Sequence, residues 1–424
     1  MKVKESEMKK FVWALATGVS LLALGGTSGE IKTPENSKLF EQRIDPVSKV
    51  VSYALRYGAP DDNRQSLYFI TKSMTDDGRF LLFWHTKGNE RKPSMGRRHV
   101  MMADLLKEEV FDLGEPSGKM YTWFIECRQN YAVYADARGD FWRLPFADPT
   151  KRERLCALPK ELSDMGQVLS LATHLTLTRD RTKAFLDVCV RTPQGRLRWV
   201  QGLLTLATGA WEPWGETDFM ANHGQLNPVN DRLAMVAWEM AWEKQGQEYK
   251  KRTGFYPRMW LVEPGDKRRL VPAEARNFAS HEIWDDDGKG FSWCGWGSMI
   301  PADTVYHCDL ATGRQEKWCG FAGARHNSCS PDNRYVVTDV APERWWRGCK
   351  WRVGFWNRET DKGVWIYTTR PALMPVNNQS KLHPDPHPHF VMNAKYVVST
   401  ASNADGHMDV YVTPVAPLVE MTKK

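Results

Sequence analysis

The chain has 424 residues, of which 42% are apolar and 26% are charged. This length fits either two or three domains or one large repetitive fold, and the composition excludes a disordered chain, a coiled coil and an integral membrane protein. The net charge of +7 is modest and spread along the chain, so it indicates at most an anionic ligand and predicts no nucleic-acid partner. The 19 tryptophans favour a β-rich fold, and exposed indole rings suit stacking on sugars.

The first 29 residues have the pattern of a secretory signal peptide. Lys9 and Lys10 precede an apolar run from Phe11 to Leu24, and small residues follow at 25–29. The apolar run is shorter than the roughly 20 residues that span a bilayer. We therefore expect residues 1–29 to be removed and residues 30–424 to form a secreted or periplasmic protein with no membrane insertion.

A phrase made of a polar turn and a following apolar or alternating strand recurs along the chain. Each interval of about fifty residues has room for four short strands and their loops, which is typical of a propeller. We therefore predict an all-β fold, a single seven-bladed β-propeller domain over residues 30–424 with four-stranded antiparallel blades. The seven turn residues are Asp77, Asn130, Asp180, Asn230, Asp286, Asp332 and Asn393.

Two further segments bear on the predicted ring. The strand near Lys49–Leu55 is expected to complete the last blade, which ends soon after Val415, because an open sheet edge invites aggregation. The segment Glu239–Lys251 has weak helical periodicity, and we interpret it as a long polar loop.

Histidines recur at one position of the repeat, five to seven residues before a turn residue. In a propeller this position is the start of the innermost strand, where the blades converge on one mouth of the central channel. Two interpretations are open: the histidines form a ligand site, or each hydrogen-bonds within its own blade as in WD-type repeats. The five histidines are His174, His223, His281, His326 and His387.

The pair His387 and His389 suggests a metal site. In an extended strand, residues two apart point to the same face, and His326 belongs to the adjacent blade. We predict that these three imidazoles bind a divalent metal, with manganese, zinc and calcium as candidate ions and Cys329 as a further candidate ligand. The other cysteines lack the spacing of a zinc site and are expected to be buried apolar side chains.

At this point the chain resembles the seven-bladed propeller polysaccharide lyases, namely oligogalacturonate lyase and its ulvan lyase relatives. The resemblance covers the second half well and the first three blades only by repeat shape. It implies a metal held by one histidine and a later Gln-x-x-His-x-His, which His326, His387 and His389 fit, although Pro384 occupies the position of the glutamine. The phrases that carry it are NHGQLNP (222–228), PRMWLVEPG (257–265), SHEIWDDDGKG (280–290), HNSCSPDNRYVV (326–337) and HPHF (387–390).

The chemistry of such a lyase agrees with the residue types. Elimination at a uronate removes a weakly acidic proton from the carbon that bears the carboxylate, so this negative charge must first be neutralised. A neutral histidine is a suitable base, and by position the base is His281 or His223. Tyr256 is a candidate proton donor or relay, with simple packing as its alternative.

Arginine side chains are candidates to bind the uronate carboxylate, because the guanidinium matches a carboxylate in a bidentate arrangement. Arg258 is the first candidate, with a structural ion pair to Glu239 or Glu243 as the alternative. Arg325, His174 and Gln65 are predicted to contribute to substrate binding.

Two other functions remain open. Related propellers are α-L-rhamnosidases that remove rhamnose from glucuronic acid in arabinogalactan, working from a different face near the first blade. There Gln65 occupies the position expected for a histidine, and an amide cannot act as an acid or base. The chain could also be an inactive glycan-binding relative. The favoured interpretation is that the protein is a monomeric lyase that acts on an acidic oligosaccharide or polysaccharide.

Overall fold

The computed structural model describes residues 29–87, 98–114, 123–217, 219–238, 242–245, 248–251, 258–272, 278–296, 304–340, 351–368, 385–402 and 407–423. Ile31–Lys424 is one compact unit, and the predicted signal peptide falls almost entirely outside the described residues. The helices in these ranges are α1 (Lys160–Asp164) and α2 (Val415–Thr422). Neither of them has the length and apolar character needed to cross a membrane.

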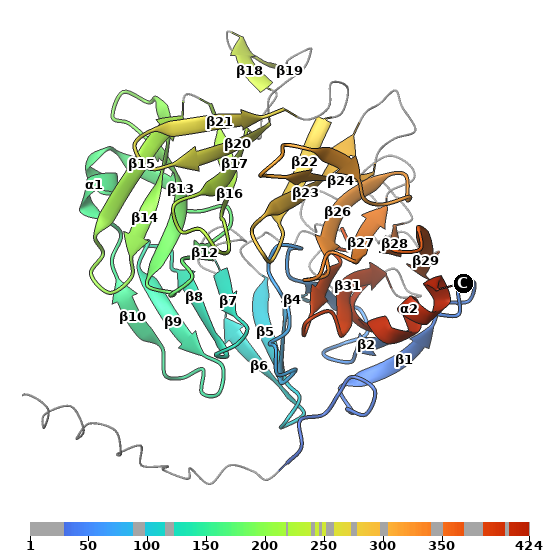
Figure 1. Cartoon of the computed structure of the whole chain (residues 1–424). Coiled ribbons are helices and arrows are strands. Elements are labelled where there is room, and N and C mark those ends of the chain that lie inside the picture. Colours follow the sequence, from blue (N-terminus) through green and yellow to red (C-terminus); the bar gives the residue numbers. More distant parts are fainter. Residues whose placement is uncertain are drawn as a thin grey trace, which may run out of the picture. The chain divides into compact units, whose positions relative to one another are not determined.

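Seven antiparallel sheets succeed one another along the chain and form a seven-bladed β-propeller, as the spacing of the turn residues predicted (Figure 1). Blade 1 consists of β3 (Asn63–Ser66), β4 (Phe80–Thr86), β5 (His99–Asp104) and β6 (Glu109–Gly114). Blade 2 consists of β7 (Trp123–Glu126), β8 (Tyr131–Ala135), β9 (Phe141–Pro145) and β10 (Glu153–Cys156). Blade 3 consists of β11 (Gln167–Ser170), β12 (Thr176–Leu177), β13 (Lys183–Arg191), β14 (Leu197–Thr205) and β15 (Trp211–Thr217).

The second half of the chain repeats the arrangement. Blade 4 consists of β16 (Ala221–Leu226), β17 (Ala234–Trp238), β20 (Met259–Glu263) and β21 (Lys267–Val271). Blade 5 consists of β22 (Phe278–Trp284), β23 (Gly290–Trp296), β24 (Val305–Asp309) and β25 (Gln315–Lys317). Blade 6 consists of β26 (Ala324–Cys329), β27 (Tyr335–Val340), β28 (Arg352–Asn357) and β29 (Lys362–Tyr367).

Blade 7 combines strands from both ends of the described chain. It contains β30 (His389–Val391), β31 (Tyr396–Ser402) and β32 (Met408–Pro414), followed by β2 (Val51–Leu55) and β1 (Phe40–Ile44). Strand β2 pairs antiparallel with β32. The expected closure of the ring by the segment near Lys49–Leu55 is therefore confirmed.

The segment Glu239–Lys251 differs from its prediction as a polar loop. It contains two short strands, β18 (Trp242–Gln245) and β19 (Glu248–Lys251), which pair with each other as a separate hairpin between β17 and β20. Polar residues dominate both strands, and Gly246 stands between them at a position suited to a turn, so the weak helical periodicity did not indicate a helix.

The predicted turn residues stabilise the turns at which the innermost strands end. The Asp77 Oδ1 accepts hydrogen bonds from the Thr75 hydroxyl at 2.7 Å and from the Arg79 backbone N–H at 3.0 Å. The same arrangement recurs at Asp180 and at Asp332. An aspartate that bonds its own local backbone stabilises a tight turn, so the repeated turns lie together at one mouth of the channel.

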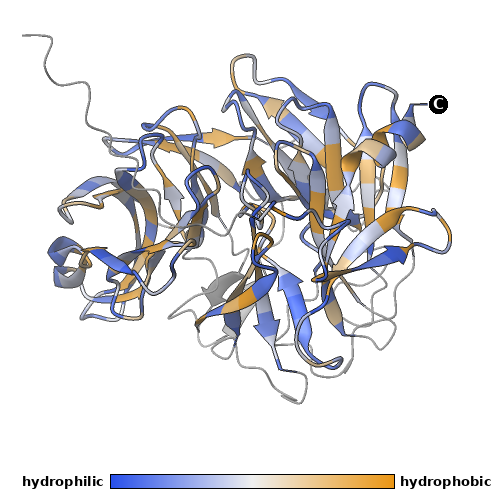
Figure 2. Ribbon diagram, turned by 90° about the horizontal axis from the view of Figure 1, so that it is seen from below, coloured by the Kyte–Doolittle hydropathy of each residue, from blue (hydrophilic) through white to orange (hydrophobic). Residues whose placement is uncertain are grey.

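The hydrophobic core lies between neighbouring blades. Between blades 1 and 2, for example, Phe80 and Leu82 of β4 belong to one buried cluster with Ala132 and Leu144. Burial of a large apolar side chain contributes about 1.5–3 kcal/mol. Figure 2 shows apolar and polar positions interleaved along the strands. The blades therefore hold each other by their faces, and the innermost strands are left to supply polar groups to the channel.

Candidate functional site

The structure brings all five predicted histidines together at the mouth opposite the turns. Their ring centroids are separated by 4.9 Å for His174 and His223, 6.3 Å for His223 and His281, 4.0 Å for His281 and His326, and 4.5 Å for His326 and His387. All five side chains are buried. We refer to these residues as the histidine ring.

Irregular backbone turns these histidines inward. In β16, β22 and β26 the pairing register shifts where the histidine stands, which is the signature of a β-bulge. His223 and His281 both have φ of 53°, and His387, just before β30, has φ of 46°. A left-handed backbone at a residue with a Cβ costs about 1–2 kcal/mol, and such strain concentrates at functional sites.

A loop from blade 1 fills the channel against the histidine ring. Strand β3 pairs with β4 before residues 67–73, and Met74 forms a bridge to Leu81 of β4 after them, so residues 67–73 leave the sheet as an insertion that we call the floor loop. The ring of Tyr68 stacks on His174 at a centroid distance of 5.2 Å, and the ring of Phe69 lies 5.2 Å from that of His326. The floor loop therefore separates the histidine ring from the mouth that carries the turns.

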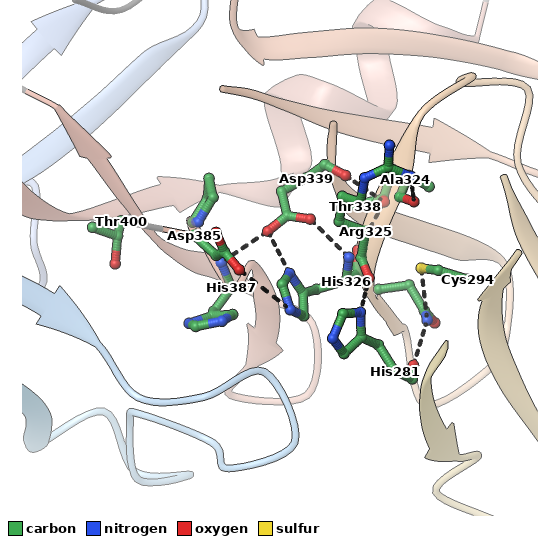
Figure 3. A network of polar contacts seen from close by, with 12 residues as sticks. His281, Cys294, Ala324, Arg325, His326, Thr338, Asp339, Asp385, His387 and Thr400 are labelled. Atoms are coloured by element: carbon green, nitrogen blue, oxygen red, sulfur yellow. Dashed lines mark hydrogen bonds and ion pairs between the residues drawn. The ribbon is translucent and has the colours of Figure 1, made fainter. Parts of the chain in front are cut away.

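Two of the histidines and one carboxylate form a candidate metal centre. One ligand atom each from His326, Asp385 and His387 lies within 4.8 Å of the others, and all three residues are buried. The His326 Nε2 is 3.8 Å from the Asp385 Oδ2 (Figure 3). Two imidazoles with a carboxylate are a common donor set for zinc and manganese. The residues therefore fit a divalent metal ion.

Asp339 hydrogen-bonds both histidines of this cluster without being one of its candidate ligands. Its Oδ1 accepts the backbone N–H of His326 at 2.7 Å, and its Oδ2 lies 2.9 Å from the His326 Nδ1. Its Oδ2 also accepts the backbone N–H of His387 at 3.2 Å. Because a carboxylate only accepts, the His326 Nδ1 carries the proton and Nε2 presents its lone pair on the side of Asp385.

The predicted metal trio requires one correction, because His389 belongs elsewhere. Its Nε2 accepts the Ser73 backbone N–H at 3.0 Å, and its Nδ1 donates to the His387 carbonyl at 2.9 Å. Burial lowers the pKa of His389 to about 4. The left-handed backbone at His387 breaks the alternation on which the prediction relied, so the two rings do not share a face. Asp385 is the third member instead.

His281 is set up as a neutral imidazole with one defined tautomer. Its Nδ1 donates to the Arg325 carbonyl, so the lone pair lies on Nε2. Burial, followed by the neighbouring His326, His223 and Arg258, lowers the pKa of His281 well below its ordinary value. At neutral pH this side chain is therefore able to accept a proton.

Beside His281 lies a buried cluster of Arg258, Glu282 and His223, of which only Arg258 and His223 were identified from the sequence. Arg258 donates from Nε to the Glu282 Oε2 at 3.0 Å and from Nη2 to the Glu282 Oε1 at 3.4 Å. The His223 Nδ1 is 3.3 Å from the Glu282 Oε1 and 3.4 Å from the Arg258 Nη2. Burial raises the pKa of Glu282, but Arg258 and His223 outweigh it and hold this pKa far below its ordinary range. Sequence reasoning missed Glu282, although it directly follows His281.

Burial also governs His174, the remaining member of the histidine ring. Desolvation and the nearby His223 lower the pKa of His174 well below its ordinary value. Its ring is packed between Tyr68 and His223. His174 is therefore a neutral, stacked side chain next to the predicted bases.

Two other predicted residues lie near the candidate metal centre, and one falls outside the described residues. Arg325 is half-buried and donates from Nη1 to the Ala324 carbonyl at 3.3 Å. The Gln65 Nε2 is 3.5 Å from the Asp385 carbonyl, so Gln65 lies beside the candidate metal centre and not at a different face as expected. Tyr256 is not among the described residues.

Cys329 is wrong as a candidate ligand. Its thiol contacts the Ser292 hydroxyl at 3.6 Å and lines a cavity of about 150 Å³ on the turn side of the floor loop. Burial raises the pKa of this thiol strongly, whereas metal binding needs a thiolate. Of the seven cysteines in the described ranges, Cys156, Cys294, Cys308 and Cys319 are buried, in agreement with the expectation of buried apolar side chains for most of them.

Hydrogen bonds between a histidine and an aspartate of one blade occur in the histidine ring at His326 with Asp339, and outside the ring in two further blades. The His85 Nε2 is 2.9 Å from the Asp62 Oδ2 in blade 1, and the His307 Nε2 is 2.7 Å from the Asp285 Oδ2 in blade 5. The WD-type interpretation therefore suits these pairs, while His223 and His281 contact Glu282 and the Arg325 carbonyl of the next blade.

Together the fold and the site define a seven-bladed β-propeller with a candidate metal centre at one channel mouth. Solved structures with the same fold include an oligogalacturonate lyase in complex with manganese, with a TM-score of 0.71 and 18% identity over 91% of this chain and 97% of that chain. They also include an oligogalacturonate lyase from Vibrio parahaemolyticus, with a TM-score of 0.69 and 17% identity over 89% of this chain and 96% of that chain. No protein-family model and no curated protein sequence matches the chain. The resemblance to these lyases is thus confirmed at the level of the fold.

Proposed function

We propose that the protein is a polysaccharide lyase that cleaves a glycosidic linkage at a uronic acid in a plant or algal polysaccharide by metal-assisted β-elimination. The observation that carries the proposal is the neutral His281 with its ring centroid 4.0 Å from that of His326, a member of the candidate metal centre. A proton acceptor next to a cation site is the arrangement that this reaction needs. The similar fold of a manganese-bound oligogalacturonate lyase supports the proposal and makes manganese the first ion to test, before zinc and calcium.

In the proposed reaction His281 accepts the proton from the carbon that bears the uronate carboxylate. A carbon–carbon double bond forms, the bond from the adjacent carbon to the glycosidic oxygen breaks, and that oxygen takes up a proton. A bound divalent cation would supply the positive charge that stabilises the negative charge developing at the carboxylate. The Arg325 carbonyl keeps the lone pair of His281 on Nε2, and burial keeps the imidazole neutral.

The two arginines have different tasks in this proposal. The charge of Arg258 is balanced by the buried Glu282, so Arg258 orients Glu282 and His223 rather than serving as an uncompensated carboxylate clamp. Arg325 directly precedes His326 in β26, donates from Nη1 to the Ala324 carbonyl and is half-buried. We assign Arg325 to the uronate carboxylate and His174 to the neighbouring part of the sugar chain.

A panel of glycans tests this proposal. The purified protein is incubated with polygalacturonate, ulvan and arabinogalactan, with chelator and with each added metal, and the ultraviolet absorbance of unsaturated uronates is recorded. We expect absorbance to rise with one substrate, to be abolished by chelator and to return with manganese. Absence of unsaturated product from every glycan contradicts the lyase proposal. Release of rhamnose would identify a hydrolase, and binding without any product would identify an inactive relative.

We also propose that the protein is exported, on the basis of the basic and apolar pattern before residue 30. Expression of the full chain in a bacterial host followed by mass spectrometry of the periplasmic fraction tests this. The mature chain is expected to begin close to Glu30. A full-length chain retained in the cytoplasm contradicts it.

A further inference from the structure

Two buried aspartates connect neighbouring blades at the mouth that holds the histidine ring. The first is Asp187 on β13 of blade 3, seven residues after the turn residue Asp180. Its Oδ1 accepts the backbone N–H of Thr173 in the same blade at 2.7 Å, and its Oδ2 accepts the backbone N–H of Gly224 in blade 4 at 3.1 Å. Both bonds end on backbone groups, so Asp187 is a clamp between two blades.

Asp339 occupies the equivalent place in blade 6, seven residues after the turn residue Asp332. It accepts the backbone N–H of His326 in its own blade at 2.7 Å and that of His387, which leads into blade 7, at 3.2 Å. These two bonds repeat those of Asp187. The third contact of Asp339, 2.9 Å between Oδ2 and the His326 Nδ1, reaches an imidazole (Figure 3), whereas the side chain that Asp187 bonds in blade 3 is that of Thr173.

The two aspartates hold different residues, and this difference distinguishes the structural role of Asp187 from the functional role of Asp339. Gly224 has no side chain, and a Cβ built there would come within 3.0 Å of the Asp187 side chain. Its counterpart, with the same spacing of six residues before a turn residue, is His387. The clamp between blades 6 and 7 therefore holds two histidines of the candidate metal centre where the clamp between blades 3 and 4 holds Thr173 and Gly224.

We infer that Asp339 is a positioning residue that fixes the backbone of both His326 and His387 and selects the metal-binding tautomer of His326. This inference rests on the proposed metal centre and names a residue that acts on it without being a ligand. With a carboxylate beside Nδ1, the proton stays on Nδ1 and Nε2 remains an electron-pair donor. A carboxyl-to-amide change reverses this arrangement, because the amide N–H can donate to Nδ1 and leave the proton on Nε2.

The test compares Asp339→Asn with Asp187→Asn as the matched control. Mn²⁺ binding by each purified protein is titrated by electron paramagnetic resonance, and melting temperatures are recorded in the presence of chelator. Loss of a second contact to a ligating histidine typically weakens metal binding 10-fold to 100-fold. We expect this weakening for Asp339→Asn only, with both variants losing thermal stability to a similar extent. Equal Mn²⁺ affinity in the wild type and Asp339→Asn overturns the inference, as does an equal loss in Asp187→Asn.

A measurement on the wild type covers the case in which Asp339→Asn does not fold. Histidine is labelled with ¹⁵N, and the signals of His326 are assigned as those that are missing from the spectrum of His326→Gln. We expect these signals to show a protonated Nδ1 and an unprotonated Nε2. The Nε2 signal is expected to shift when Zn²⁺ is added. A proton on Nε2 of His326, or an Nε2 signal that does not shift when Zn²⁺ is added, overturns the inference. A protein that binds Mn²⁺ as expected but forms no unsaturated uronate contradicts the proposed function and leaves the role of Asp339 standing.

Discussion

At the scale of single residues, the tautomer and the pKa of a site histidine depend on neighbouring groups that a sequence pattern does not identify. The tautomer of His281 is set by a backbone carbonyl of the next blade, and its neutrality is set by burial. Both effects arise only when the innermost strands converge. A histidine of the same sequence context on an exposed strand would titrate near pH 6.5 and would have no neighbouring carbonyl to fix its tautomer.

The first prediction concerns His281. His281→Gln is expected to lower turnover on a cleaved glycan by about 100-fold or more, since general base catalysis contributes about that much. In the wild type the neutral form accepts the proton and its pKa is lowered, so kcat/KM is expected to hold as the pH falls through 6.5 and to decline only at lower pH. The pH–rate profile of the wild type and the turnover of the variant are measured.

His307→Gln is the control for this prediction, because His307 pairs with Asp285 within blade 5 and lies outside the histidine ring. It is expected to change stability and to leave turnover within a few-fold of the wild type. A His281→Gln protein with full activity, or a profile that declines through pH 6.5 and above, would exclude His281 as the base.

The second prediction concerns Arg258 and differs from what its sequence position suggested. A carboxylate clamp could be truncated with little structural cost, but Arg258→Met leaves the buried Glu282 without its cation. Breaking a buried ion pair by removal of one partner typically costs about 3–5 kcal/mol. We expect a loss of this size by urea denaturation, largely recovered in the double variant Arg258→Met with Glu282→Gln. If the single variant is as stable as the wild type, the pair does not balance charge as described.

The identity of the site residues was only partly predictable. All five histidines of the ring were found from their spacing to the turns, because the repeat places the start of every innermost strand at one mouth. The exchange of His389 for Asp385 was not predictable, since strand periodicity assumes extended backbone and His387 has φ of 46°. A single aspartate between two prolines carries no periodic signal of its own.

At the scale of elements, the floor loop is the feature that repeat analysis could not anticipate. The repeat identified β4 from its polar turn, but nothing in the repeat marks residues 67–73 as an insertion between two segments that both pair with β4. The insertion carries Tyr68 and Phe69 to histidines that belong to blades 3 to 7. One loop of blade 1 thus determines how deep the histidine mouth is.

The third prediction tests this packing. Phe69 is 2% exposed, and Phe69→Ala is expected to lower the free energy of unfolding by about 3–5 kcal/mol, the usual range for a buried phenylalanine. Lys72→Ala in the same loop is the control, because its ion pair with Asp286 is solvent-exposed and worth about 1 kcal/mol or less. Both are measured by urea denaturation. Equal, small losses in the two variants would show that the floor loop is not packed into the channel.

At the scale of the whole molecule, the ring is held shut by two kinds of contact between distant parts of the chain. Near the outside, β2 completes blade 7 by pairing with β32, and the Ser52 hydroxyl lies 2.8 Å from the Thr413 hydroxyl. Near the axis, Ser66 of blade 1 is bonded to Thr400 of blade 7 through its backbone N–H at 2.9 Å. The number of blades and the closing strand were predictable because turn spacing and chain ends are sequence properties, whereas these side-chain contacts depend on how the ring closes.

The fourth prediction follows from the candidate metal centre, which joins blade 6 to the segment entering blade 7. Ligand that binds only the folded state adds about 2.7 kcal/mol at a concentration one hundred times its dissociation constant. Mn²⁺ in such excess is therefore expected to raise the melting temperature by a few degrees relative to chelator. The double variant His326→Gln with His387→Gln should lose this difference. An unchanged melting temperature in the wild type at saturating metal would count against a metal centre between these blades.

The last prediction tests closure of the ring by β2. Tyr53 on β2 pairs with Val412 of β32, while Gln42 lies on β1 at the outer edge of the same sheet. The Arg56 N–H bonds to the Leu39 carbonyl and the Asp45 N–H to the Val50 carbonyl. By strand alternation, the N–H of Tyr53 therefore faces β32 and that of Gln42 faces away from the sheet. A proline at Tyr53 removes a ladder hydrogen bond, whereas a proline at Gln42 removes none. Tyr53→Pro is therefore expected to lower the melting temperature strongly and to promote aggregation, because the freed edge of β32 can pair with another chain. Gln42→Pro should remain monodisperse and close to wild type. Size-exclusion chromatography and thermal denaturation measure both effects, and a Tyr53→Pro protein as stable and monodisperse as Gln42→Pro would show that the ring does not depend on β2 for its closure.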